Sequence, residues 1–127
     1  MERKELAAGY KLGGYNCAQA VLKAFEPELG LDEATLMKLG TGFGIGMGTM
    51  EGTCGALVGA QMVQGLLKPG ATLRDAKQTT KSFKELCGAT ACKDIKGKDT
   101  GVVLCSCEDC VRHAVELAEA QIQNPDG

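Results

Sequence analysis

The chain has 127 residues, of which 44% are hydrophobic and 24% charged, and its formal net charge at pH 7 is −2. These proportions are typical of globular proteins, so we expect one folded domain over residues 1–127 rather than a disordered chain. The weakly acidic balance and an aromatic content of 4%, without Trp, exclude the basic surfaces and stacking platforms of nucleic-acid-binding proteins.

The N-terminal segment is charged and lacks the apolar stretch of a secretory signal. Even the most apolar stretch, residues 54–67, contains glutamines and glycines, so we expect no membrane span. These features predict a cytoplasmic protein, and in a reducing cytosol cysteines are more often catalytic, redox-sensing or metal-bound than paired in structural disulfides. The seven cysteines are also an odd number, so they cannot all pair within one chain.

Three helices are predicted in the first third of the chain. Asn16 and Asp32 are good N-caps for the second and third of them, and Pro27 and Gly30 are expected to close the second. The predicted helices span residues 2–11, 17–25 and 33–39.

A glycine-rich stretch follows, with glycine at positions 40, 42, 44, 46, 48 and 52. Its alternation with apolar residues resembles a strand, but glycine weakens strands and leaves one face bare. We therefore interpret the stretch as a loop, or as a helix packed tightly against a neighbour. A dinucleotide-binding site would require a preceding strand and a βαβ unit, which the chain lacks. Close approach of backbone segments, or a loop over the Cys54 site, is the preferred explanation.

The remaining chain predicts three longer helices and one short helical turn. Thr72 and Ser106 are N-cap residues, and Asp109 completes a pattern that resembles a capping box. Pro125 is expected to end the last helix. The helices span residues 54–67, 73–86 and 107–121, and the short turn spans residues 92–95. The fold class is therefore all-α, a single-domain helical bundle of about five helices with a glycine-rich connection.

Several cysteines are placed at predicted helix starts. Cys17 follows Asn16, Cys54 and Cys107 open two other helices, and Cys92 fits the same pattern. Helix starts present unpaired N–H groups and the positive end of the helix dipole, and both favour a thiolate. The alternative is that these cysteines are small hydrophobic core residues. Seven cysteines are more than core filling requires, so we favour a thiol site.

The densest cluster is Cys105-Ser-Cys107-Glu-Asp-Cys110. A C-x-x-C at a helix start places both sulfurs on one face, which is the arrangement of redox dithiols and of half a metal site. It is not a haem attachment motif, because Val111 stands where C-x-x-C-H requires histidine. His113 could serve as a ligand or proton shuttle, although we prefer to interpret it as a surface histidine.

Four segments together resemble the C_GCAxxG_C_C family of redox-active proteins. They read G-Y-N-C-A-Q-A-V at residues 14–21, C-G-A-L-V-G-A at 54–60, C-K-D-I-K-G at 92–97 and C-V-R-H-A at 110–114. The second segment departs from the family pattern, because its glycine follows the cysteine. The resemblance spans roughly residues 14–117 and maps the family's four signature cysteines onto Cys17, Cys54, Cys92 and Cys110.

The resemblance implies a redox function without an assigned substrate. A related domain occurs in split-Soret cytochrome c, but haem cannot be carried over to this chain. Cys87, Cys105 and Cys107 lie outside the signature, and the resemblance gives them no role.

Three hypotheses remain open on this basis. The four signature cysteines carry out thiol–disulfide exchange or electron transfer, or they hold an iron–sulfur cluster or zinc, with Cys107 as an extra ligand. The third is a structural helical interaction module. No carboxylate pair or Ser/His/Asp set indicates a hydrolase, which leaves a thiol-dependent oxidoreductase as the enzyme class to test. The expected partners are a redox protein or a small thiol, and a homodimer would suit so small a bundle.

Overall fold

The computed structural model describes residues 1–124, and within them regular structure is helical with no strands. The predicted all-α class is therefore confirmed. Thr53 and Ala91 form an isolated antiparallel bridge. The helices are α1 (Arg3–Leu12), α2 (Cys17–Ala24), α3 (Glu26–Leu29), α4 (Glu33–Gly40), the 3₁₀ turn η1 (Thr41–Phe43), α5 (Gly55–Leu67), α6 (Leu73–Cys87), α7 (Cys92–Lys96) and α8 (Cys107–Gln123).

The expected number of about five helices is wrong, because the described residues contain eight α-helices. Pro27 does not simply close the preceding helix. It lies in the first turn of α3, where a missing N–H is tolerated because that group has no helical partner. The turn expected at residues 92–95 is the short helix α7. The single-domain organisation stays a prediction, and the expected helix end at Pro125 lies outside the described residues.

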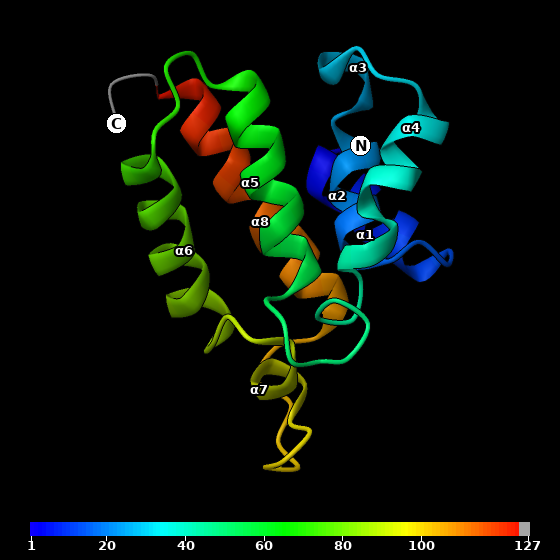
Figure 1. Cartoon of the computed structure of the whole chain (residues 1–127), viewed down its shortest axis with the longest axis vertical. Coiled ribbons are helices and arrows are strands. Elements are labelled where there is room, and N and C mark those ends of the chain that lie inside the picture. Colours follow the sequence, from blue (N-terminus) through cyan, green and yellow to red (C-terminus); the bar gives the residue numbers. More distant parts are fainter. Residues whose placement is uncertain (125–127) are drawn as a thin grey trace.

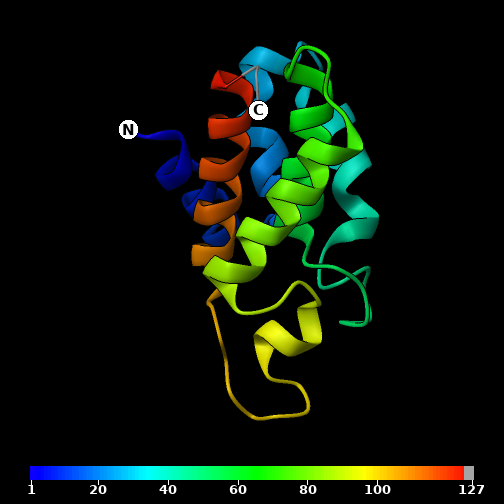
Figure 2. The ribbon, with the colours of Figure 1, turned by 90° about the vertical axis from the view of Figure 1, so that its left-hand side faces the viewer.

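The longer helices pack around α5 and α8, which lie against each other at the centre of the molecule (Figure 1). Helix α2 packs on α5, α1 packs on both α2 and α8, and α6 covers another side of α8. Figure 2 shows α7 and the long connection after it at the end of the molecule where α8 begins. The glycine-rich connection, residues 40–52, reaches the same end (Figure 1). None of the helices in residues 1–124 is long and apolar enough to cross a membrane.

Small residues allow the central helices to approach closely. A methyl group added to Gly55 would lie 2.5 Å from the carbonyl oxygen of Phe43, and one added to Gly59 would lie 3.1 Å from the carbonyl oxygen of Ala18. The helix starts that carry the cysteines can therefore meet at one end of the bundle.

The predicted N-caps are confirmed where they precede cysteines. The Asn16 side chain accepts a hydrogen bond from the Gln19 N–H at 2.8 Å, and the Gln19 side chain accepts one from the Asn16 N–H at 3.0 Å. Ser106 accepts a hydrogen bond from the Asp109 N–H at 3.1 Å. These local hydrogen bonds determine where α2 and α8 begin, and so where Cys17 and Cys107 lie.

Candidate functional site

Four cysteines from four separate segments line one cavity of about 90 Å³. Three of them are the first residues of α2, α7 and α8, and the fourth is the N-cap of α5. Helix starts that are distant in the sequence therefore converge at the end of the bundle formed by α7 and the glycine-rich connection (Figures 1 and 2). We call this cavity the thiol pocket, and its cysteines are Cys17, Cys54, Cys92 and Cys107.

The glycine-rich connection forms one wall of the thiol pocket, through Ile45, Gly46 and Met50. It is a series of turns, as predicted for a loop. Gly46 has a φ of +55°, and a Cβ added to it would lie 2.6 Å from the Cβ of Cys92. Only glycine permits this backbone to pass so close to the cysteine. The predicted close approach of backbone segments is therefore confirmed.

Two of the other wall residues adopt a backbone conformation that is rare for L-amino acids. Ile45 has a φ of 52° and Met50 a φ of 65°. Left-handed conformations of non-glycine residues cost roughly 1–3 kcal/mol each, and they cluster at binding and active sites. The surrounding structure therefore compensates for strain at the edge of the thiol pocket.

Cys107 is the one cysteine of the pocket whose pKa is lowered, to about 5. The main cause is a hydrogen bond donated by the Cys17 thiol, which stabilises the Cys107 thiolate. Burial acts against this, while the charges of Lys96 and Lys11 act with it. The position of Cys107 at the start of the 17-residue helix α8 favours the thiolate as well. Cys107 is therefore ionised at neutral pH.

The neighbouring cysteines are neutral thiols. The pKa of Cys17 is raised because its thiol donates to Cys107 and because it is buried. The pKa of Cys54 is raised by its hydrogen bond with Cys110 and by burial, which together outweigh the N–H groups at the start of α5. Burial also raises the pKa of Cys92. One thiolate thus stands beside protonated thiols.

Lys96 connects the pocket with the sulfurs behind it. Its Nζ donates to the carbonyl oxygen of Cys105 at 2.9 Å and lies 3.9 Å from the Sγ of Cys110. Burial would lower the pKa of Lys96, but the sulfurs of Cys110 and Cys107 outweigh it, and the pKa is raised. This ammonium group therefore stays charged and stabilises the Cys107 thiolate.

The fourth signature cysteine, Cys110, is fully buried and does not line the pocket. It contacts Cys54 from the protein interior, and its sulfur lies within 4.8 Å of those of Cys87 and Cys105. The structure thus brings Cys17, Cys54 and Cys92 to one cavity and places Cys110 directly behind it. The half-buried His113 is not among the residues that line the cavity.

Sequence reasoning did not single out the two lysines of the pocket. Lys11 lies in the last turn of α1 without a distinctive sequence pattern, and Lys96 lies in a short stretch with several lysines. Cys107 was assigned only an accessory role, although its place after an N-cap serine was a usable signal. The remaining positions could be found only from the packing of the helices.

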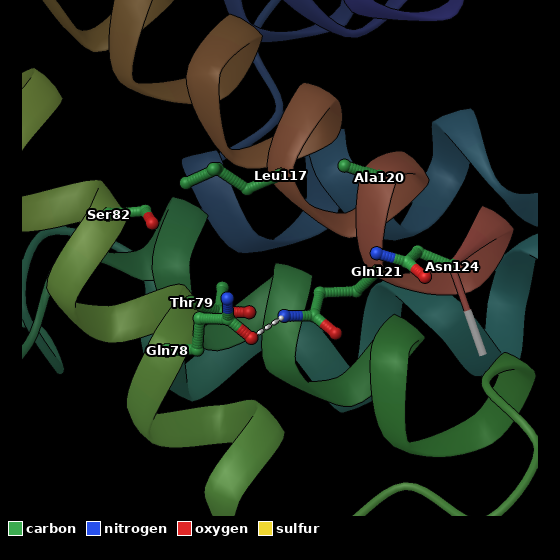
Figure 3. Close-up of a pocket in the computed structure, with 7 residues that line it drawn as sticks. All are labelled: Gln78, Thr79, Ser82, Leu117, Ala120, Gln121 and Asn124. Atoms are coloured by element: carbon green, nitrogen blue, oxygen red, sulfur yellow. Dashed lines mark hydrogen bonds between the residues drawn. The ribbon is translucent and has the colours of Figure 1, made fainter. Parts of the chain in front are cut away.

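A second hollow lies between α6 and α8 and has a different character. Figure 3 shows that it is lined mainly by amide and hydroxyl side chains, and that Gln121 donates a hydrogen bond to Gln78, at 3.1 Å. Its lining contains neither cysteine nor an ionisable side chain. It lies along the second half of α8, away from Cys107, and is therefore separate from the thiol pocket.

Comparison with known proteins identifies the family of the chain. No curated protein and no solved structure matches the chain. The family model described as "Putative redox-active protein (C_GCAxxG_C_C)" matches residues 15–121, which is well over half of the chain and includes all seven cysteines. The chain therefore belongs to the C_GCAxxG_C_C family.

Proposed function

We propose that the protein exchanges thiols and disulfides at the thiol pocket, with Cys107 as the attacking thiolate and Cys17 as the resolving thiol. The observation that carries this proposal is the pair itself, a Cys107 thiolate that accepts a hydrogen bond from Cys17 beside Lys96. Reduction of a disulfide requires a thiolate that attacks it and a neighbouring thiol that resolves the mixed disulfide, and this pair provides both.

In the proposed reaction, the Cys107 thiolate attacks one sulfur of a substrate disulfide and breaks its S–S bond. The first substrate thiolate leaves and takes a proton from water. Cys17 then loses its proton to solvent and attacks Cys107, which forms a Cys17–Cys107 disulfide and releases the second substrate thiolate. Two electrons pass from the protein to the substrate, and a dithiol reductant returns the pair to its starting state.

The remaining signature cysteines extend the pair. Cys54 and Cys92 line the same cavity, and Cys110 contacts Cys54 from the interior. We propose that Cys17, Cys54, Cys92 and Cys110 are redox cysteines together with Cys107. A disulfide formed at the pocket can then be passed inward by further exchange. The natural partner is a redox protein or a small thiol of a reducing compartment such as the cytoplasm.

The convergence of four cysteines on one cavity favours a second candidate, an iron–sulfur cluster or zinc. Thiolates suit both, and Lys11 and Lys96 would offset their negative charge. No three of the pocket sulfurs form a trio within 4.8 Å, whereas two sulfurs on one Zn²⁺ lie about 3.8 Å apart. A cluster, in which different thiolates bind different irons, therefore fits the pocket better than a single ion. When bound, it would supply electron transfer, while the lysines would stabilise its charge.

The test is the alkylation of anaerobically reduced, metal-free protein by iodoacetamide at pH 6, with mass spectrometry to locate the label. We expect Cys107 to react first, because at this pH it is the ionised thiol of the pocket. Cys107→Ser should abolish the fast phase, and Cys105→Ser, two residues away and also half-buried, should retain it. Slow labelling of Cys107 would overturn the exchange mechanism. Iron, sulfide and zinc analysis of anaerobically purified protein then tests the second candidate.

A further inference from the structure

Three cysteines form a compact group behind the thiol pocket. The sulfurs of Cys87, Cys105 and Cys110 all lie within 4.8 Å of one another. We call this group the thiol triad. Its members come from the end of α6, the connection between α7 and α8, and the first turn of α8. Within residues 1–124 it is the one group of three or more potential metal-ligating side chains that lie this close together.

We propose that the thiol triad binds a divalent, thiophilic cation of the Zn²⁺ class, separately from the chemistry of the thiol pocket. Thiolates are the preferred ligands of such ions. Bound Zn²⁺ places its thiolate sulfurs about 3.8 Å apart, so only a small closure of the three side chains is required. Two members of the triad, Cys87 and Cys105, lie outside the four-cysteine signature, so this site would distinguish the chain from relatives that carry only the signature.

Core packing alone does not explain the triad. Cys87 and Cys110 are buried, as hydrophobic thiols would be, but Cys105 is half-buried and open to solvent. The ammonium group of Lys96 lies 3.9 Å from the Cys110 sulfur and is anchored 2.9 Å from the carbonyl oxygen of Cys105. A fixed cation beside the Cys110 sulfur stabilises a thiolate ligand at this member of the triad much more than it stabilises a neutral thiol.

The formal charges also favour a divalent ion. Three thiolates would be balanced by one divalent cation and the Lys96 ammonium group, which leaves the buried group neutral. Cys105 lies on the connection between two helices, so a small movement there admits the ion. A Zn²⁺ ion held by three thiolates keeps a fourth coordination position, which a water molecule or an external thiol can take.

The experiment is a titration of anaerobically reduced, metal-free protein with Cd²⁺, followed by thiolate-to-metal charge-transfer absorption and by competition with a chelator. The matched variants are Cys105→Ser, which removes a triad ligand, and Cys107→Ser, which changes the neighbouring pocket. We expect Cys105→Ser to weaken the tightest Cd²⁺ binding by at least about tenfold. Loss of a group that only hydrogen-bonds to a metal ligand already lowers metal affinity by about that factor, and Cys105 would be a ligand itself. Cys107→Ser should keep it. The reverse order, or equal affinity in Cys105→Ser and wild type, would overturn the proposal.

A second measurement uses the wild-type protein and does not depend on a variant that folds. Zn²⁺ added before alkylation should slow the labelling of Cys105, as judged by mass spectrometry, and unchanged labelling would count against the site. The rate at which Cys107 is alkylated at pH 6 in Cys105→Ser separates the two proposals. A normal Cys107 rate with lost Cd²⁺ binding supports both proposals. A slow Cys107 rate with lost Cd²⁺ binding removes only the exchange mechanism, and a normal Cys107 rate with wild-type Cd²⁺ binding removes only the metal site.

Discussion

At the scale of single residues, the proposed thiol exchange depends on an asymmetry between two cysteines. Cys17 and Cys107 both start helices, yet one pKa is raised and the other is lowered to about 5. The two sulfurs share one proton. Lys11 favours ionisation of both cysteines, whereas Lys96 is among the main influences on Cys107 alone and so favours the thiolate there. The reactive position is therefore a property of the pair and its lysines, and neither cysteine would have it alone.

This argument predicts the effect of Cys17→Ala. The substitution removes the largest influence that lowers the Cys107 pKa, so we expect that pKa to rise from about 5 toward its ordinary value of 9.0. The pH dependence of Cys107 alkylation measures it. The rate in wild type should reach its plateau above about pH 6, because the ratio of thiol to thiolate falls tenfold with each pH unit above the pKa. In Cys17→Ala the rate should still be increasing at pH 7.

The matched control is Cys92→Ala, which removes another pocket thiol that is not among the main influences on Cys107. Its profile should resemble that of wild type. Coincident profiles for Cys17→Ala and wild type would show that the hydrogen bond between the two cysteines does not control the ionisation of Cys107.

The residue scale also shows what the sequence can and cannot predict. An N-cap followed by a cysteine is a local pattern, and it correctly marked Cys17 and Cys107 as helix-start thiols. The neighbours of those thiols are set by packing between distant segments, so nothing local indicates that Lys96 lies against Cys110 or that Cys87 joins Cys105. The signature pointed to Cys110, whereas the structure gives the lowered pKa to Cys107.

At the scale of elements, the glycine-rich connection determines the shape of the pocket wall. Gly46 and Gly48 both have positive φ, 55° and 81°, so an alanine at either position strains the backbone. Only at Gly46 would the new methyl group also meet a cysteine, 2.6 Å from the Cβ of Cys92. At Gly48 nothing lies within 4 Å.

We therefore expect Gly46→Ala to change the environment of Cys92 and Gly48→Ala to leave it unchanged. Both should be destabilised by roughly 1 kcal/mol or more through the backbone, because alanine is strained where φ is positive. Urea unfolding measures this shared cost, and the rate at which a thiol reagent labels Cys92 in folded protein reports the difference. Equal Cys92 labelling in the two variants would mean that the connection does not press on the cysteine.

Helix α5 offers a second matched pair of glycines. A methyl group at Gly55 would lie 2.5 Å from the Phe43 carbonyl oxygen, so Gly55→Ala forces the backbones apart and should cost roughly 1–3 kcal/mol. Gly65 is exposed and has nothing within 4 Å, so Gly65→Ala should stabilise the protein by roughly 0.5–1 kcal/mol through helix propensity. Urea unfolding measures the free energy of unfolding of both variants, which should fall for Gly55→Ala and increase for Gly65→Ala. Stabilisation by Gly55→Ala would contradict the close packing of Gly55 against Phe43.

Element boundaries were largely predictable, because capping is local. Asn16, Asp32 and Ser106 each accept the expected hydrogen bond from the third residue of the helix that follows. The short helix α3 was missed because Pro27 can either stop a helix or start one, and only the chain beyond it decides which. The path of the glycine-rich connection was equally undetermined, since glycine permits many backbones and the contact with Cys92 selects one.

At the scale of the whole molecule, a buried charged network and the thiol pocket lie at opposite ends of α5. The buried Lys68 donates to Asp75 at 2.9 Å and to Gln121 at 2.7 Å, where the end of α5, the start of α6 and the end of α8 meet. Helix α5 has 13 residues, which corresponds to about 20 Å between this network and Cys54. Changes at the two ends should therefore act independently.

Asp75→Asn tests that separation. Lys68 is the main cause of the lowered pKa of Asp75, so the ionised carboxylate stabilises the fold at pH values above its unfolded pKa, and this contribution is lost as the pH falls through the folded pKa. We expect a lower Tm for Asp75→Asn at pH 7 and a smaller difference from wild type in acid, where wild-type Asp75 is protonated too. Glu85→Gln, at an exposed position on the same helix, should leave the Tm nearly unchanged.

The pH dependence of Cys107 alkylation in folded Asp75→Asn should match that of wild type. The reason is distance, because the length of α5 separates the removed charge from Cys17 and Cys107. A shifted Cys107 profile would show instead that the charged network is transmitted through α5 or α8 to the pocket.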